Sequence, residues 1–589
     1  MNEQYRPFSC GALRSEHIDM RVEIAGWVHR RRDHGGLIFI DLRDHEGLTQ
    51  VTVDPAHPEA FAAAETLRSE DVVRMAGIAR RRPAGTENER LATGAVELAV
   101  ERVTVSARSQ TPPFPIASDE EIDETLRLRY RYLDLRRPRM QQNLRLRHRL
   151  IKALRDYFDH AGFIEVETPL LIKSTPEGAR DYLVPSRLHR GEFYALPQSP
   201  QLLKQILMIG GIGRYMQIAR CLRDEDPRAD RQPEFTQIDV EMSFVSQEEV
   251  MEMMEGSIRA AWRVALGVEL SEPIERLSYE DAMRRFGSDK PDLRFGLELV
   301  DVAHLFAESE FATFRELAAG DPSARIIALR YPGGAALSRR DFDGWQERAK
   351  ACGAKGLAYL AFGDEVRGPI AKFLSEQERG ALLDATEAEG GDAILFVADK
   401  RSVASDAAGR LRLEIGERLG LRDPAKFAFC WVVGFPLFEK DPESGEITFA
   451  HHPFTAPLPG QEALFDDEPL SLRAQHYDLV LNGFELGSGS IRNHDAAFQR
   501  KVFHRLGLED AEIDARFGFF LTALTYGAPP HGGMALGIDR VVMLACGETS
   551  IREVIAFPKN QHARDVMMDA PSPVPEQSLK ELFIAPIRA

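Results

Sequence analysis

Five short strand-like segments fill the first 107 residues, and this pattern constrains the fold more than any other feature of the chain. Segment 22–24 alternates apolar and polar residues, and strand-like runs follow at 37–42, 48–53, 72–78 and 96–105 with turn residues between them. Five strands in this length predict a small closed barrel of the oligonucleotide-binding type. The proline-rich segment 111–115 and the acidic segment 118–124 predict a linker that ends this domain.

The rest of the chain predicts a larger domain in which helices and strands are mixed. The 589 residues exceed what one hydrophobic core can organise, so three or four domains are expected. Segment 144–158 has helical apolar spacing, and segments 163–169, 240–244 and 427–433 read as strands far apart in the chain. Strands that pair over such distances favour an antiparallel α+β domain over a doubly wound one. Further apolar segments at 326–329, 358–362 and 393–397 predict a separate α+β domain inserted into it.

Composition excludes several classes of protein. The apolar fraction of 44% and the charged fraction of 28% are typical of globular proteins, and no apolar run is long enough to span a membrane. The amino terminus lacks the apolar core of a signal peptide. The five cysteines are scattered, which predicts neither a zinc site nor a disulfide framework and favours the cytoplasm. The formal net charge of −18 argues against indiscriminate binding of nucleic acid, although local basic surfaces remain.

The predicted barrel carries the residue types of a single-strand reader. Two basic triplets, 30–32 and 80–82, lie in this domain, and a third basic stretch follows at 127–155. For any one such run a solvated surface is the expected explanation. Phe39 and Gln50 fall on the second and third strands, beside the 30–32 triplet, which is expected to form a loop. An aromatic ring, an amide and the Arg32 guanidinium would stack on and hydrogen-bond to bases. The alternative is that Phe39 belongs to the barrel core.

The segment Gly533–Arg540 gives the first chemical signal. Its glycines allow a ligand to approach the backbone, and Arg540 offers a planar charged fork that suits a phosphate group. Taken alone, a glycine-rich turn before a helix more often serves packing.

Two further segments supply candidate ligand-binding groups. Segment 220–241 reads as a strand, a charged loop and a returning strand, in which Arg223 could neutralise a phosphate and Phe235 could stack on adenine. In segment 482–492 the glycines could admit a ligand, and Arg492 is available for a carboxylate. Asp478 and Glu485 could hold Mg²⁺. The alternative for segment 220–241 is a surface hairpin with ion pairs.

Together these segments resemble a known family over essentially the whole chain. Segments 162–169, 223–241 and 532–540 are similar to motifs 1, 2 and 3 of the class II aminoacyl-tRNA synthetases. Segments 174–181, 198–204, 287–294, 451–455 and 485–492 resemble those of the bacterial-type aspartyl-tRNA synthetases. Several long motifs in the right order are far more specific than one glycine pattern. Departures are small: Ser488 stands where glycine is common, and Asn493-His494 follows Arg492.

The resemblance implies an ATP-dependent ligase that joins aspartate to tRNA(Asp), and it implies roles for particular residues. Arg223 and Arg540 would be catalytic, the first bridging the α-phosphate and the aspartate carboxylate and the second holding the γ-phosphate. The aspartate site would consist of Glu177, Ser199, Gln201, Lys204, Arg223, Asp239, His451 and Arg492, with His451 on a mobile loop. The ATP site would consist of Arg223, Asp224, Glu225, Gln232, Phe235, Glu485, Gly537, Ile538, Asp539 and Arg540.

Two cations of this set suggest how aspartate is selected. By resemblance, Lys204 and Arg492 clamp the side-chain carboxylate of the substrate. Asparagine has the same shape but no charge, so it would leave two buried cations without a counter-charge.

The family resemblance also predicts which tRNA is read. Members that charge both tRNA(Asp) and tRNA(Asn) typically carry a histidine and a glycine at the positions of His34 and Gly85. The anticodon set is then Arg32, His34, Phe39, Gln50 and Gly85, and a non-discriminating enzyme is favoured. The alternative is that His34 is only a polar loop residue and that tRNA(Asp) alone is charged.

The domains expected from this resemblance are a barrel at 1–107, a linker at 108–142, a catalytic domain at 143–287 and 426–565, an inserted domain at 288–425 and an extension at 566–589. Motif 1 predicts a symmetric homodimer. A non-catalytic tRNA-binding protein would have no use for Arg223, Glu485 and Arg540 together. A tRNA-independent amide ligase would not need the barrel, and a lysine-specific relative would need an acid in place of Lys204 or Arg492.

Overall fold

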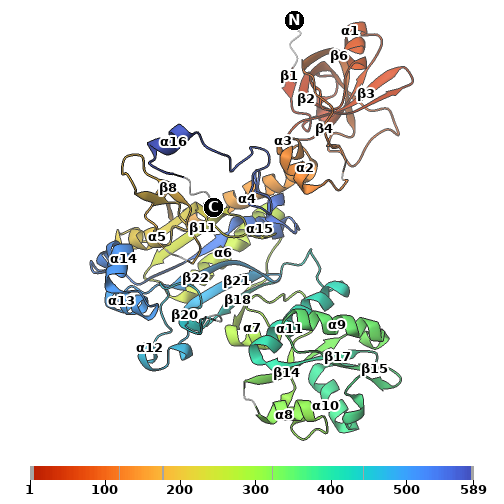
Figure 1. The fold of residues 1–589 in the computed structure, drawn as a ribbon. Coiled ribbons are helices and arrows are strands. Elements are labelled where there is room, and N and C mark those ends of the chain that lie inside the picture. Colours follow the sequence, from red (N-terminus) through yellow and green to blue (C-terminus); the bar gives the residue numbers. More distant parts are fainter. Residues whose placement is uncertain (1–5, 119, 176–177, 321–322, 442–443, 586–589) are drawn as a thin grey trace. The chain divides into compact units, whose positions relative to one another are not determined.

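The computed structural model describes residues 6–118, 120–175, 178–320, 323–441 and 444–585. The chain forms two compact units, one of residues 1–145 and 552–572 and the other of residues 146–551 and 573–589. Figure 1 shows the strands and helices of each unit. Among the described residues, no helix combines the length and the apolar character that a membrane crossing requires.

The first unit contains the predicted closed barrel. Its strands hydrogen-bond in the order β1-β2-β3-β4-β6-β5, and an additional pairing of β2 with β5 closes the barrel. The elements are β1 (Arg6–Phe8), β2 (Arg21–His34), β3 (Leu37–Arg43), β4 (Leu48–Val53), α1 (Pro58–Glu65), β5 (Val72–Arg81) and β6 (Val96–Ala107). The five predicted strands are confirmed. Strand β1 was not predicted, because it is only three residues long and pairs in parallel with β2 at one edge.

Strands β2 and β3 show where the Arg30–Arg32 triplet and Phe39 lie in the barrel. The Arg30–Arg32 triplet lies within β2, which continues to His34, so the expectation of a loop there was wrong. In β3, Ile38 and Ile40 point into the barrel core, while Phe39 between them is half-buried on the opposite face. Phe39 is therefore not a core residue.

Arginines of the linker anchor the segment 552–556 within this unit. Helices α2 (Glu124–Arg129) and α3 (Arg131–Asp134) precede α4 (Pro138–His160). Arg131 is buried and donates to the carbonyl oxygens of Arg552, Ile555 and Ala556 at 2.7, 2.8 and 2.9 Å. Arg127 makes a two-point ion pair with Glu553 at 2.6 and 2.9 Å. The first arginines of the basic stretch 127–155 therefore hold this segment in place, and they do not form a solvated surface.

The second unit is built on a large, mainly antiparallel sheet of eight strands. Their order is β12-β18-β21-β22-β23-β11-β10-β7, and only the two end pairs, β12 with β18 and β7 with β10, are parallel. The strands are β7 (Ile164–Glu165), β10 (Arg214–Leu222), β11 (Glu234–Ser243), β12 (Glu275–Ser278), β18 (Phe429–Val433), β21 (His476–Leu481), β22 (Phe484–Ile491) and β23 (His531–Gly537). The predicted strand, loop and returning strand of segment 220–241 are β10 and β11.

Helices and small hairpins surround this sheet. Helices α5 and α15 contact β11, and α6 contacts β23. The helices are α5 (Gln201–Ile209), α6 (Gln247–Leu266), α7 (Tyr279–Phe286), α12 (Leu464–Asp467), α13 (Ala496–Arg505), α14 (Asp510–Leu524), α15 (Ile538–Ala545) and α16 (Glu576–Glu581). Two hairpins, β8 (Leu183–Pro185) with β9 (Phe193–Ala195) and β19 (Phe438–Lys440) with β20 (Ile447–Phe449), complete this part.

The inserted segment forms a sheet of its own, drawn in green in Figure 1. Its order is β13-β14-β17-β15-β16, and every pairing is antiparallel. The elements are β13 (Val300–Asp301), α8 (Ala312–Gly320), β14 (Ala324–Tyr331), α9 (Arg339–Ala351), β15 (Ala358–Phe362), β16 (Val366–Arg367), α10 (Glu376–Thr386), β17 (Ala393–Lys400) and α11 (Arg401–Arg418). The three apolar segments predicted as its core are β14, β15 and β17.

Candidate active site

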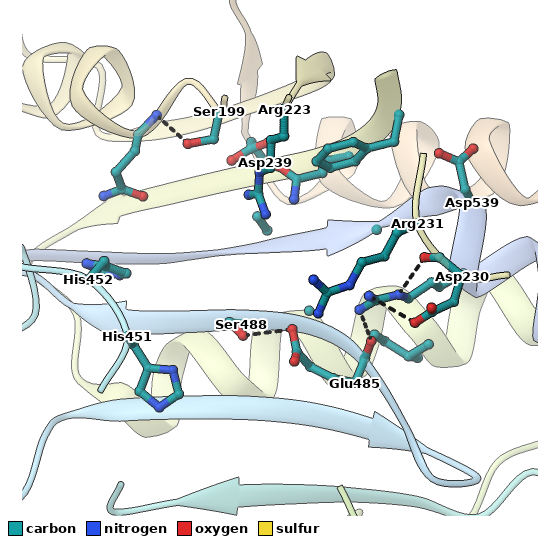
Figure 2. Close-up of a pocket in the computed structure, with 18 of the residues that line it drawn as sticks. Ser199, Arg223, Asp230, Arg231, Asp239, His451, His452, Glu485, Ser488 and Asp539 are labelled. Carbon is teal, nitrogen blue, oxygen red and sulfur yellow. Dashed lines mark hydrogen bonds and ion pairs between the residues drawn. The ribbon is translucent and has the colours of Figure 1, made fainter. Parts of the chain in front are cut away.

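A pocket of about 360 Å³ opens on the large sheet and collects residues from segments far apart in the chain. Many of the predicted site residues line it: Ser199, Gln201, Lys204, Arg223, Glu225, Gln232, Phe235, Asp239, His451, Glu485, Arg492, Gly537, Asp539 and Arg540. Asp224, Asp478 and Ile538 do not line it, and Glu177 lies outside the described residues. Figure 2 shows part of this lining.

The register of four strands explains why distant residues meet here. Asp239 of β11 lies opposite Ala535 of β23, Ala535 lies opposite Ser488 of β22, and Ser488 lies opposite Asp478 of β21. Directly opposed residues of antiparallel strands project from the same face of a sheet. One row across the sheet therefore carries two carboxylates and a hydroxyl, with a small alanine in between.

The next row, two residues along each strand, has the same character. Glu241 lies opposite Gly533, Gly533 opposite Ser490, and Ser490 opposite His476. Gly533 is required by packing: a Cβ atom there would lie 2.0 Å from the Val240 carbonyl oxygen and 2.2 Å from Oε2 of Glu241. This glycine makes room for a neighbouring carboxylate, and the segment 531–537 is a strand instead of the expected glycine-rich turn.

Two cations and two carboxylates form a buried cluster at one end of the pocket. Arg492 holds Glu241 at two points, from Nε to Oε1 at 3.0 Å and from Nη2 to Oε2 at 3.1 Å. Lys204 Nζ lies 2.9 Å from Oδ1 of Asp239 and 3.6 Å from Oε2 of Glu241. All four residues are at most 2% exposed.

This cluster corrects the hypothesis about amino-acid selection. Lys204 and Arg492 already have carboxylate partners, so an uncharged substrate would not leave them without a counter-charge. Burial alone would raise the pKa of Glu241, but Arg492 and Lys204 outweigh it and lower that pKa, which keeps the group ionised. Oδ2 of Asp239 has no hydrogen-bond partner within the described part of the chain and is available as an acceptor.

Two further arginines, Arg540 and Arg223, line the pocket. Arg540 Nη2 pairs with Asp230 at 3.2 Å, and its Nη1 donates to the Glu485 carbonyl oxygen at 2.9 Å. The Arg223 guanidinium lies 5.1 Å from the ring centre of Phe235. Its buried Nε has no hydrogen-bond partner among the residues described. Arginine held over an aromatic ring is suited to receive a phosphate beside a stacked base.

Asp539, the neighbour of Arg540, has a mainly structural environment. Its Oδ2 accepts a hydrogen bond from the Thr236 backbone N–H at 2.9 Å, and its Oδ1 pairs with Arg147 at 2.5 Å. These contacts fix the start of α15 against β11 and α4. Both carboxylate oxygens of Asp539 are thus engaged within the protein, so Arg540 is the better candidate for contact with a ligand.

A buried histidine and two acids form the third group of the site. His476 Nε2 donates to Oδ1 of Asp478 at 2.9 Å, and burial lowers the pKa of His476 to about 3. Burial raises the pKa of Asp478 to about 6. Burial, followed by repulsion from Asp478, also raises the pKa of Glu485. Figure 2 shows Ser488 donating to Glu485, at a distance of 3.2 Å.

The barrel of the first unit has a pocket of its own, which is lined by Arg30, Arg32, Asp41, Gln50 and Arg82 among others. Arg32 lies opposite Phe39, and Asp41 lies opposite Gln50, so all four side chains share one face. His34 and Gly85 do not line this pocket.

The site residues that the sequence did not predict are mainly hydrogen-bond or ion-pair partners of residues that it did predict. Glu241 holds Arg492, Asp230 holds Arg540, and His476 holds Asp478. The i, i+2 spacing of Asp239 and Glu241 in a strand was the available signal, because it places both carboxylates on one face. Asp230 lies in an irregular loop and offered no such signal.

Known proteins match both parts of this structure. The family model described as "tRNA synthetases class II (D, K and N)" matches residues 123–561, and the one described as "OB-fold nucleic acid binding domain" matches residues 22–106. The solved asparaginyl-tRNA synthetase from Pyrococcus horikoshii, complexed with asparaginyl-adenylate, has a TM-score of 0.58 and 18% identity. The alignment covers 95% of this chain and 98% of that one, which indicates a shared fold.

Curated relatives are much closer in sequence. The aspartate–tRNA(Asp/Asn) ligase of Rubrobacter xylanophilus is 54% identical over 99% of this chain and 97% of its own length. The aspartate–tRNA ligase of Geobacillus kaustophilus is 51% identical over 98% of each chain. The fold and site are those of a class II tRNA synthetase, and the chain belongs to the aspartate–tRNA ligase family of that class.

Proposed function

We propose that this protein activates aspartate with ATP and transfers the aspartyl group to the 3′ end of tRNA. The observation that carries the proposal is that one pocket combines a buried cluster of paired charges with two further arginines. Lys204 and Arg492 are held by Asp239 and Glu241, and Arg223 and Arg540 line the same pocket. Such a pocket suits an amino acid with a second carboxylate beside a nucleotide triphosphate.

The chemistry required of the protein is positional and electrostatic. Arg223 would neutralise the α-phosphate while Phe235 stacks on adenine, and Arg540 would hold the γ-phosphate. A carboxylate oxygen of aspartate attacks the α-phosphorus, pyrophosphate leaves, and aspartyl adenylate forms. A terminal ribose hydroxyl of tRNA then attacks the carbonyl carbon, and AMP leaves. Asp239, through its unpartnered Oδ2, would accept a hydrogen bond from the substrate ammonium.

Selection of aspartate over asparagine follows from donor chemistry. Lys204 and Arg492 carry only hydrogen-bond donors, and each nitrogen of Arg492 already bonds a group of the protein, one of which a ligand would replace. The carboxylate of aspartate accepts from both, whereas the amide nitrogen of asparagine is itself a donor and would leave donors facing donors. An unsatisfied buried polar group costs about 1–3 kcal/mol, and more where a charged group is involved.

Asp478 and Glu485 fit a role in holding Mg²⁺. Both carboxyls have raised pKa values mainly because they are buried, and repulsion from Asp478 raises the pKa of Glu485 further, so a cation would relieve that cost. Oxygen ligands of this kind are preferred by Mg²⁺, which usually binds one or two carboxylates together with substrate phosphates. The ion would neutralise charge on the triphosphate.

We further propose that tRNA(Asn) is charged as well as tRNA(Asp). Phe39, Arg32 and Gln50 share the exposed face of the barrel and would stack on and hydrogen-bond to anticodon bases. His34 is exposed at the end of β2, and Gly85 has a φ of +83° with open space where a side chain would be. A residue as small as Gly85 would permit either of the third anticodon bases that distinguish tRNA(Asp) from tRNA(Asn).

The active form is proposed to be a symmetric homodimer in the cytoplasm, where translation uses charged tRNA. In the second unit, several large apolar side chains of or near the motif 1 segment are exposed, including Ile164, Leu170, Leu171, Leu183 and Phe193. An exposed apolar surface of this kind marks an interface.

The decisive assay is ATP–pyrophosphate exchange with aspartate, asparagine or lysine as the only amino acid. Exchange with aspartate alone supports the proposal, and exchange with lysine or asparagine but not aspartate contradicts it. Charging of purified tRNA(Asn) with aspartate tests the broader tRNA range, and no charging would limit the enzyme to tRNA(Asp).

A further inference from the structure

His476 contacts two groups that serve different ends of the pocket. Its side chain is 1% exposed. Its ring stacks on that of His451 with centroids 3.8 Å apart and planes 13° apart. Phe435 packs edge-on against both imidazoles, with centroid distances of 4.8 Å to His451 and 4.9 Å to His476. The segment that carries His451 is thus attached to β21 through an aromatic stack.

The other side of His476 leads to the nucleotide end. A carboxylate only accepts hydrogen bonds, so the 2.9 Å contact with Asp478 places the hydrogen on Nε2. Ser488, opposite Asp478 in the sheet, donates to Glu485 at 3.2 Å. Arg540 donates in turn to the Glu485 carbonyl oxygen at 2.9 Å. A continuous series of contacts therefore runs from His451 to Arg540.

We propose that His476 is a positioning residue that couples the His451 segment to the Asp478–Glu485 acid pair. The proposal rests on the proposed function, in which His451 lies at the aspartate end and the acids lie at the ATP end. Through the stack and the hydrogen bond, His476 fixes one group at each end at the same time.

The bonding of the ring itself favours this role over simple packing. Nδ1 of His476 is buried and has no partner within the described residues. Leaving a buried polar atom unsatisfied is unfavourable, and an apolar ring of similar size would avoid that cost. A phenylalanine at this position would lose the hydrogen bond to Asp478. A glutamine would lose the stacking on His451.

Two substitutions separate these contacts. His476→Gln can still donate to Asp478 but cannot stack, so the KM for aspartate in pyrophosphate exchange should rise about three- to tenfold with less than a twofold change for ATP. His476→Phe keeps a stacking ring and loses the donor, so the KM for ATP should rise by a similar factor, with aspartate little changed. Calorimetric titration of each substrate separately should show the same division.

Leu479→Ala is the matched control, because Leu479 is buried in the same strand and its side chain projects from the face opposite to His476 and Asp478. It should lower the melting temperature, and the KM for aspartate should not change relative to the KM for ATP. Equal changes in both KM values for His476→Gln, or no change, would overturn the role of His476. Should His476→Phe fail to fold, the directional result for His476→Gln decides alone. A wild-type protein that shows no aspartate-dependent exchange would instead overturn the proposed function.

Discussion

Arg492 and Glu241, 251 positions apart in sequence, form a two-point ion pair that is almost completely buried beneath the pocket. Glu241 belongs to β11, and Arg492 follows β22. Strand β23 lies between them and places Gly533 where any side chain would collide with the carboxylate. The pair fixes the guanidinium before a substrate arrives, which reduces the ordering cost of binding.

Replacing Arg492 should remove aspartate activation and leave ATP binding intact. Arg492→Leu deletes donors at the amino-acid end only, so exchange with aspartate should fall at least about 100-fold, and the Kd of ATP should change less than about threefold. It also leaves Glu241 buried without its partner, which costs about 3–5 kcal/mol of stability.

The double variant Arg492→Leu/Glu241→Gln separates folding from activity. It removes both charges, so the melting temperature should recover part of the loss while aspartate activation stays absent. Recovery of activity in the double variant would show that Arg492 does not bind the substrate. The corresponding Lys204→Leu variant should behave like Arg492→Leu.

The space made by Gly533 gives a second test. Gly533→Ala places a methyl group against the Val240 carbonyl and the Glu241 carboxylate, and overpacking of this kind costs about 1–3 kcal/mol or more. Both the melting temperature and aspartate activation should fall. Gly380→Ala is the control: it lies in helix α10 with open space around it, so it should be neutral or raise stability. Similar melting temperatures for both variants would refute the packing argument.

The sequence predicted most of the fold and the chemical identity of the pocket, but not its internal pairing. The strand-like run at residues 48–53 specified β4 to the residue, and the helical spacing after residue 144 located α4. The glycines of segment 533–537 suggested a turn because strands rarely contain them, whereas here Gly533 allows β11 to approach β23.

The pairing register of the strands explains which parts of the site the sequence did not predict. That Ser488 faces Asp478, or that His476 lies in the row of Glu241, depends on pairing between strands that a single sequence does not specify. The selection hypothesis was wrong about the counter-charges for the same reason: the alternation of Asp239 and Glu241 was visible, but their proximity to Lys204 and Arg492 was not.

Acid stability should depend on His476. Burial lowers its pKa to about 3, whereas an unfolded histidine titrates near 6.5. Between these values the unfolded chain binds a proton that the folded protein does not, so the free energy of unfolding falls as the pH is lowered. His476→Gln cannot titrate, so its melting temperature should fall less than that of the wild type between pH 7 and pH 4.5. His562→Gln, at an exposed position, should follow the wild type, and identical curves for all three proteins would contradict the assignment.

The half-buried ring of Phe39, on the outer face of the barrel, should matter for tRNA alone. Phe39→Leu removes a stacking surface worth about 1–3 kcal/mol per base, so the KM for tRNA should rise about 5- to 150-fold while pyrophosphate exchange is unchanged. Phe61→Leu is the control, because Phe61 packs against the core of the same barrel and would lower stability without a selective effect on tRNA. A tRNA KM that stays at the wild-type value in Phe39→Leu would remove this residue from the interface.

The most direct test of the account is transfer of labelled aspartate by the purified protein to purified tRNA(Asp), with tRNA(Asn) and tRNA(Lys) in parallel and ATP and Mg²⁺ present. Aspartylation of tRNA(Asp) and tRNA(Asn), and none of tRNA(Lys), is the expected result. Failure to aspartylate tRNA(Asp), in a preparation that is folded and binds ATP, would contradict it.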